Sequence, residues 1–201
     1  MTNAFRAGLV LASLVLGAPG AIAADTAKES TKATTGRDSQ VAASDRKFME
    51  KAALGGMAEV ELGNVAQQNA SNAEVKQFGA KMVQDHSKAG DELKQLAQSK
   101  GVALPSALDS KDKREVDKLS KLSGAKFDHE YMEHMVKDHK KDVKEFEKAS
   151  KDSRDADLKS FAAKTLSVIQ GHLMMAERIE DATKGKPDAG SPEKMGANPK
   201  K

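Results

Sequence analysis

Histidines stand in the middle of long apolar stripes at three places in this chain. His86 and His139 each close a pentapeptide of the form Met-Val-x-Asp-His, at residues 82–86 and 135–139. His172 lies in a third such stretch, and Glu59 offers a carboxylate in a fourth. Imidazole and carboxylate groups together suit zinc, copper or iron. We therefore take His86, His139, His172 and Glu59 as candidate metal ligands.

The spacing places these four side chains on inward faces of helices. At about 100° per residue, His86 falls on the face of the apolar residues seven to eleven positions away, and His139 lies between Met135 and Val143. With a rise of about 1.5 Å per residue, all four lie about 15–22 Å below one end of the helices. They are therefore expected in neighbouring layers near the middle.

The di-iron signature of ferritins is absent. Such sites use a Glu-x-x-His step on two helices, but Val, Val and Ile stand three residues before the three histidines. Three interpretations stay open: core histidines satisfied by hydrogen bonds, a metal site, and histidines that point outward. The cofactor is unknown at this stage, with a transition metal as the candidate.

Composition excludes several classes of function. The 201 residues include no cysteine, so thiolate metal sites, disulfides and cysteine nucleophiles are excluded. The 33 Lys and Arg nearly balance the 30 Asp and Glu, and there is no Trp to stack on bases, so nucleic acid is not expected as a partner. We find no nucleophile elbow, no phosphate loop and no pair of mid-helix carboxylates on an apolar stripe. The pattern therefore favours a protein without enzymatic activity.

The N-terminal stretch predicts export. Arg6 precedes an apolar run at 7–17 that is too short to span a bilayer comfortably, and Ala21-Ile22-Ala23 fits a cleavage site. We predict a signal peptide at 1–23, with an N-terminal membrane anchor as the alternative, and a disordered leader at 24–43. The absence of cysteine after the apolar run excludes a lipoprotein. A disordered tail rich in Gly and Pro is expected at 183–201.

Residues 44–182 carry helical periodicity throughout and no strand pattern. Ser44 is expected to cap the first helix, a capping box at 71–74 opens the second, and the pair Gly55-Gly56 is expected to let a neighbouring helix approach closely. The long helices are expected at 45–69, from 71 to Gly101, at 125–150 and at 155–182, with a shorter one within 106–123. These elements predict an all-α fold, a ferritin-like four-helix bundle with a long crossover containing a short helix between helices two and three.

Motifs in both halves carry a family resemblance, and they span about residues 46–179. They are Phe48–Ala53, Gly55–Gly63, Val75–Phe78, Met82–His86, Phe127-Asp128-x-x-Tyr131, Met135–His139, Leu158–Ala162 and His172-Leu173. Together they resemble DUF4142, a bacterial domain-of-unknown-function family whose members are often labelled predicted outer membrane proteins. The resemblance implies a ferritin-like bundle in the periplasm or at the outer membrane, without an established activity. The family pattern includes Glu59, Asp85, His86, Tyr131, His139 and His172, but it assigns no catalytic or metal role to them.

These observations favour an exported cell-envelope helical bundle with a structural or binding role. The rival hypothesis is a metal-binding or metal-dependent redox bundle that uses the inward histidines. A third is a membrane-surface binder that acts through its lysine-bearing ends. The partners that stay open are an envelope protein, a membrane surface and a second copy of the chain.

Overall fold

The computed structural model describes residues 41–184, and within this range the fold is all-α, as predicted, with no strand. The helices are α1 (Ala43–Asn69), α2 (Ala73–Ser99), α3 (Ser110–Leu119), α4 (Gly124–Asp152) and α5 (Ala156–Thr183). Among these residues, no helix combines the length and the hydropathy that crossing a bilayer requires.

Several predicted segments lie outside the described residues. They are the signal peptide at 1–23, all but the last three residues of the leader at 24–43, and the tail beyond Lys184. Export, and the roles assigned to the two ends of the chain, therefore stay predictions.

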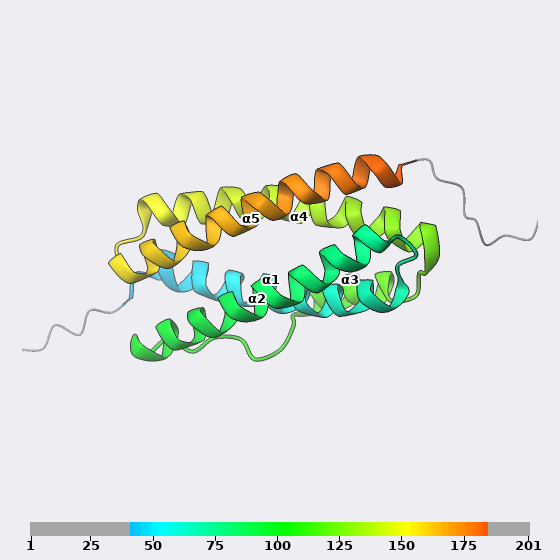
Figure 1. The fold of residues 1–201 in the computed structure, drawn as a ribbon. Helices are drawn as coiled ribbons and strands as arrows, with labels where there is room; N and C mark the ends of the chain where they lie inside the picture. Colours follow the sequence, from blue (N-terminus) through cyan, green and yellow to red (C-terminus); the bar gives the residue numbers. More distant parts are fainter. Residues whose placement is uncertain (1–40, 185–201) are drawn as a thin grey trace, which may run out of the picture. The chain divides into compact units, whose positions relative to one another are not determined.

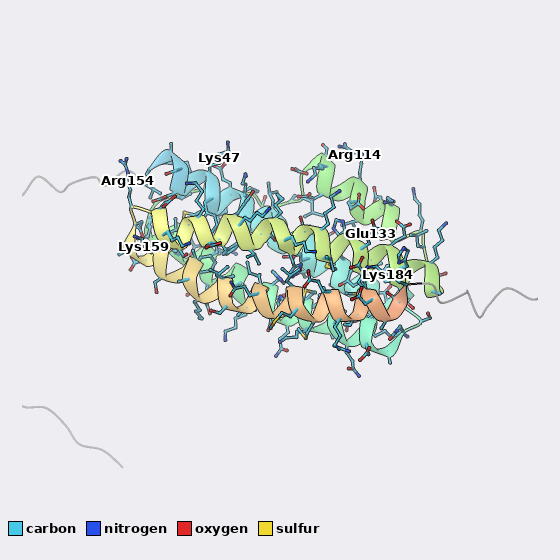
Figure 2. All side chains as sticks on the ribbon, turned by 90° about the horizontal axis from the view of Figure 1, so that it is seen from above. Lys47, Arg114, Glu133, Arg154, Lys159 and Lys184 are labelled. Carbon is cyan, nitrogen blue, oxygen red and sulfur yellow. The ribbon has the colours of Figure 1, made fainter. Side chains whose placement is uncertain are left out.

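Two helical hairpins make up the described part of the chain (Figure 1). α1 packs along α2, α4 packs along α5, and the two hairpins meet where α2 contacts α5 and α1 contacts α4. The connection between α2 and α4 contains α3, which packs on α1 and α4. Charged side chains such as Lys47, Arg114 and Arg154 project outward (Figure 2), which is the amphipathic pattern expected of helices that share a core.

The core consists of two apolar clusters. One gathers around Phe78, Phe127 and Tyr131, near the α1–α2 turn, and the other gathers around Phe146 and Phe161, toward the opposite end. On every long helix, a polar residue of the predicted site stands between the contributions to the two clusters. A polar layer therefore separates two apolar cores.

Buried aspartates fix both ends of the fold, and neither of the two predicted serine caps is formed. Ser44 does not cap α1; the position before the helix is Ala42, which makes no side-chain cap. Asp45 is buried instead and accepts hydrogen bonds from Ser153 Oγ (3.1 Å) and from the backbone N–H groups of residues 154 (3.1 Å) and 155 (3.3 Å). The first turn of α1 is thereby attached to the α4–α5 turn.

The other turn is held in the same way. Asp128 of α4 accepts bonds from the backbone N–H groups of Ser71 (3.1 Å) and Asn72 (2.9 Å), and from the Ser71 hydroxyl. The predicted capping box is therefore not formed by Ser71. Asn72 caps α2 by accepting a hydrogen bond from Glu74 N at 2.8 Å.

The close approach of α1 and α2 occurs at a different glycine pair from the one predicted. A Cβ built on Gly55 or Gly56 meets nothing within 4 Å, so that expectation is wrong. A Cβ on Gly63 would lie 2.6 Å from Gly79 O, and one on Gly79 would lie 2.7 Å from Ala66 Cβ. Helical periodicity alone does not reveal which glycine faces the neighbour.

We expect these two glycine sites to respond oppositely to alanine. Gly63→Ala should lower the free energy of unfolding by about 1–3 kcal/mol, because backbone must move apart. Gly55→Ala should raise it by about 0.5–1 kcal/mol through helix propensity alone. Urea unfolding followed by circular dichroism measures both, and equal effects at the two sites would contradict the packing described here.

Candidate metal centre

The four predicted ligands come from four different helices and meet in the polar layer. Glu59 lies on α1, His86 on α2, His139 on α4 and His172 on α5. Their exposed fractions are 1%, 7%, 0% and 0%, so the layer is closed to solvent. The interpretation in which these histidines point outward is thereby wrong.

The three histidines form a compact group. One ring nitrogen of each lies within 4.8 Å of a ring nitrogen of the other two. Ring centroids are 5.9 Å apart for His86 and His139, 5.3 Å for His86 and His172, and 5.5 Å for His139 and His172. A tetrahedral zinc ion with bonds of about 2.0–2.1 Å holds its nitrogens about 3.4 Å apart. Closure around an ion therefore needs side-chain shifts of about an ångström.

One nitrogen of each ring is held by an acceptor from the protein. Since carboxylates and carbonyls only accept hydrogen bonds, each contacted nitrogen carries the proton, and this fixes the tautomer. The contacts are His86 Nδ1 to Glu59 Oε2 (2.8 Å), His139 Nδ1 to Met135 O (3.0 Å) and His172 Nε2 to Asp85 Oδ2 (2.7 Å).

The second nitrogen of each ring has no hydrogen-bond partner within the described residues. These atoms are Nε2 of His86, Nε2 of His139 and Nδ1 of His172, and all three are buried. When the ring is neutral and the opposite nitrogen holds its proton, each of these atoms carries a lone pair. Metal-binding histidines show this arrangement, with one nitrogen for the metal and the other donating to a carboxylate or carbonyl.

The local electrostatics keep two of the rings neutral. Burial lowers the pKa of His139 below its ordinary value, and burial also lowers the pKa of His172, to about 4, although Asp85 opposes this. Burial works to lower the pKa of His86 too, but the charge of Glu59 and its hydrogen bond raise it. For Glu59, burial raises the pKa, but attraction by His86 and His139 outweighs it and lowers the pKa to about 2. The layer thus holds a firmly ionised carboxylate beside imidazoles.

Aromatic side chains close the layer on the side of the first apolar cluster. The ring of Phe78 lies 6.3 Å from that of His139 and 6.4 Å from that of His172. Tyr131 is fully buried, and its hydroxyl has no hydrogen-bond partner among the described residues. Burial raises the pKa of Tyr131, which therefore stays protonated.

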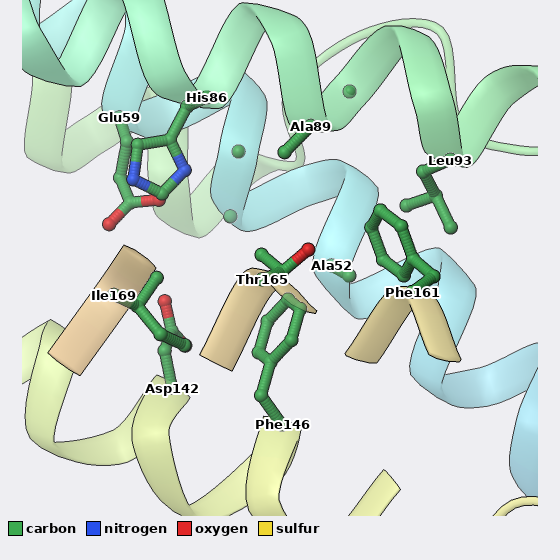
Figure 3. A pocket seen from close by; sticks show the side chains of 13 residues that line it. Ala52, Glu59, His86, Ala89, Leu93, Asp142, Phe146, Phe161, Thr165 and Ile169 are labelled. Carbon is green, nitrogen blue, oxygen red and sulfur yellow. The ribbon is translucent and has the colours of Figure 1, made fainter. Parts of the chain in front are cut away.

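On the other side lies a cavity of about 30 Å³, lined by Glu59, His86 and Asp142 among others (Figure 3). This is room for about one water molecule or one ion. The pKa of Asp142 is raised to about 9, first because the group is buried and second because Glu59 repels its charged form.

Two features of the site escaped the sequence analysis. Asp85 points away from its neighbour His86, as expected within one helix, but it reaches across to His172 on α5. Asp138 and Asp142 were also missed: they flank the apolar stripe of α4, one turn apart, and stand half-buried beside Glu59. The sequence signal that could have revealed Asp85 and Asp138 is the aspartate that precedes the histidine in both pentapeptides.

Comparison with known proteins places the chain in a family. The family described as Domain of unknown function (DUF4142) matches residues 30–179. The chain belongs to the DUF4142 family. This confirms the resemblance found in the sequence motifs.

The fold of this DUF4142 domain is similar to that of a DUF305 fragment from Deinococcus radiodurans, whose crystal structure is known. The TM-score is 0.63 at 12% sequence identity, and the match covers 71% of this chain and 98% of that fragment. At this identity the similarity concerns the fold alone. No curated protein matches the sequence.

We expect the metal-free protein to lose stability in mild acid. His172 has a pKa of about 4 when folded and 6.5 as its ordinary value, so the unfolded chain takes up the proton first as the pH falls. His172 therefore contributes a loss of stability between about pH 6.5 and 4, at about 1.4 kcal/mol per pH unit. The lowered pKa of His139 acts in the same direction, and the raised pKa of Asp142 opposes it, while the raised pKa of His86 matters only above about pH 6.5.

Melting temperatures between pH 7.5 and 4.5, measured with a chelator present, test this expectation. His172→Gln should flatten the pH dependence, whereas the matched variant His134→Gln, outside the layer, should leave it unchanged. An unchanged slope in His172→Gln would contradict the assignment of a neutral buried imidazole.

Proposed function

We propose that this domain binds a transition-metal ion through His86, His139 and His172. Two observations carry the proposal: three buried histidines from three helices gather in one compact group, and each has a buried ring nitrogen without a hydrogen-bond partner among the described residues. The opposite nitrogen of each ring is already used. A single shared partner would satisfy all three.

A purely structural histidine cluster accounts less well for this geometry. An unsatisfied buried polar atom costs about 1–3 kcal/mol, and here three such atoms occur in one layer between two apolar cores. If these side chains served only to pack the core, leucine or phenylalanine at the same positions would avoid the cost of unsatisfied polar atoms. A cation that accepts three lone pairs removes the cost in one step.

The ligand set indicates the class of metal. Neutral imidazoles suit zinc, copper and nickel, and no thiolate competes, because the chain has no cysteine. Three protein ligands leave a fourth position free, as in zinc sites that bind an exchangeable ligand. Glu59 is one of the ligands predicted from the sequence. Because its carboxylate contacts Nδ1 of His86, Glu59 is proposed to position that ring and balance the ion's charge.

The proposal includes a fold and a cellular address. Four long helices in two hairpins, with α3 inside the long connection, support a ferritin-like four-helix bundle with a crossover. Arg6, the apolar run at 7–17 and Ala21-Ile22-Ala23 support export to the envelope. In that compartment, metal binding is the binding role that the geometry favours.

Metal content is the direct test of the three-histidine site. The protein beginning at Ala24, purified without chelator or histidine tag, should bind about one equivalent of zinc or copper, because the three histidines form one compact group. His139→Ala should weaken binding by more than about 100-fold, since it removes a ligand and not only an outer partner. The matched control His134→Ala, on the same helix, should retain the metal. Absence of binding in the parent protein, or equal loss in both variants, would overturn the proposal.

The groups that accept a hydrogen bond from each histidine ring offer an independent prediction. Asp85→Ala removes no proposed ligand but frees His172 to rotate and change tautomer. We expect zinc affinity to fall by about 10–100-fold. Competition with a chromophoric chelator measures this, and Asp91→Ala on the exposed face of α2 serves as the control. Unchanged affinity in Asp85→Ala would show that the Asp85–His172 contact has no part in binding.

A further inference from the structure

A second group of potential ligand atoms lies beside the histidines. Glu59, Asp138 and Asp142 each place a carboxylate oxygen within 4.8 Å of the others. We propose that these three carboxylates bind a second cation, of the class that prefers oxygen ligands, such as Mn²⁺, Mg²⁺ or Ca²⁺. The second site shares Glu59 with the three-histidine site, and in that respect it rests on the proposed function.

The first support is an unused oxygen on Glu59. Its Oε2 contacts His86, but its Oε1 is buried and has no hydrogen-bond partner. The nearest polar atom recorded for Oε1 is His139 Nδ1 at 3.4 Å, and the hydrogen on that nitrogen is directed to Met135 O. A buried carboxylate oxygen in this position lacks a cation or a donor.

The second support comes from the repeated pentapeptide. α2 and α4 run in the same direction, and each pairs with a helix of the other hairpin, α2 with α5 and α4 with α1. Asp85 in the first copy meets His172 of α5, which donates a hydrogen bond to it. Asp138 in the second copy meets Glu59 of α1, which stands as far from the start of its helix as His172 does from the start of α5.

The two copies of the pentapeptide therefore differ in the partner of their aspartate. His172 supplies a hydrogen to Asp85, whereas an ionised Glu59 supplies none to Asp138. Two carboxylates face each other where the other half has a carboxylate and an imidazole. A cation between Glu59 and Asp138 would take the place that the N–H group of His172 takes beside Asp85.

The third support is space and access. Glu59 and Asp142 line the inner cavity of about 30 Å³, and in Figure 3 Asp142 points from α4 toward Glu59. Asp138 and Asp142 also line an outer groove of about 540 Å³ between α1, α3 and α4. Asp142 lines both, so its side chain stands between the inner cavity and the outer groove. Mn²⁺ and Mg²⁺ keep several of their waters when bound, and the groove has room for them.

One cation of the protein already competes for this position. Lys141 Nζ lies 3.8 Å from Asp138 Oδ1 and 3.9 Å from Asp142 Oδ1, too far for hydrogen bonds. Its side chain is 56% exposed and can turn to solvent. We therefore expect a metal ion to displace Lys141, and Lys141→Gln to tighten binding.

Titration with Mn²⁺, followed by the electron paramagnetic resonance signal of the free ion, tests the second site. The double variant Asp138→Asn/Asp142→Asn should bind Mn²⁺ at least about tenfold more weakly, because neutral amides replace two of the three carboxyl ligands. The matched double variant Asp91→Asn/Asp181→Asn, at exposed aspartates, should bind as the parent does. Lys141→Gln should bind more tightly than the parent.

The two sites can fail separately. His139→Ala/His172→Ala should abolish zinc binding and keep Mn²⁺ binding, while the Asp138/Asp142 double variant should do the reverse. No Mn²⁺ binding at millimolar concentration in either the parent or Lys141→Gln would overturn the second site and leave the first intact. Loss of Mn²⁺ binding in the histidine variant alone would show that Mn²⁺ occupies the histidine site. This result would also overturn the second site.

Discussion

The structure depends on a polar layer that is buried between two apolar cores. Four helices contribute one ionisable side chain each to this layer, and all four side chains are buried. Burial of such groups is costly unless each has a partner. Glu59, Asp85 and Met135 O satisfy one nitrogen of every ring, and what satisfies the remaining nitrogens decides what the domain does. Both proposed cation sites follow from that requirement.

The rest of the fold keeps the layer in register. Asp45 ties the start of α1 to the α4–α5 turn, and Asp128 ties the start of α4 to the α1–α2 turn. Each buried aspartate therefore links one hairpin to the other at opposite ends. The glycine pair Gly63 and Gly79 sets the separation of α1 and α2. A helix that slid by one turn, about 5.4 Å, would break these contacts and take its residue out of the layer.

Sequence periodicity predicted the inward faces well and the contacts between helices poorly. His86, His139, His172 and Glu59 were found because each interrupts an apolar stripe, and a common depth follows from helix rise alone. Asp85 was not found as a partner, because its acceptor role exists only once α5 lies beside α2. Asp142 flanks its stripe and resembles a surface residue until α1 covers it. Gly63 and Gly55 look alike in sequence, since only the packing direction tells them apart.

X-ray absorption at the zinc edge of the zinc-loaded, tag-free protein tests the central claim most directly. The account predicts about three imidazole nitrogens at about 2.0–2.1 Å together with a light-atom ligand from solvent. His139→Ala, loaded at the same ratio, should lose this signature. A spectrum with one imidazole or none, or one dominated by carboxylate oxygens, would contradict a site built on His86, His139 and His172.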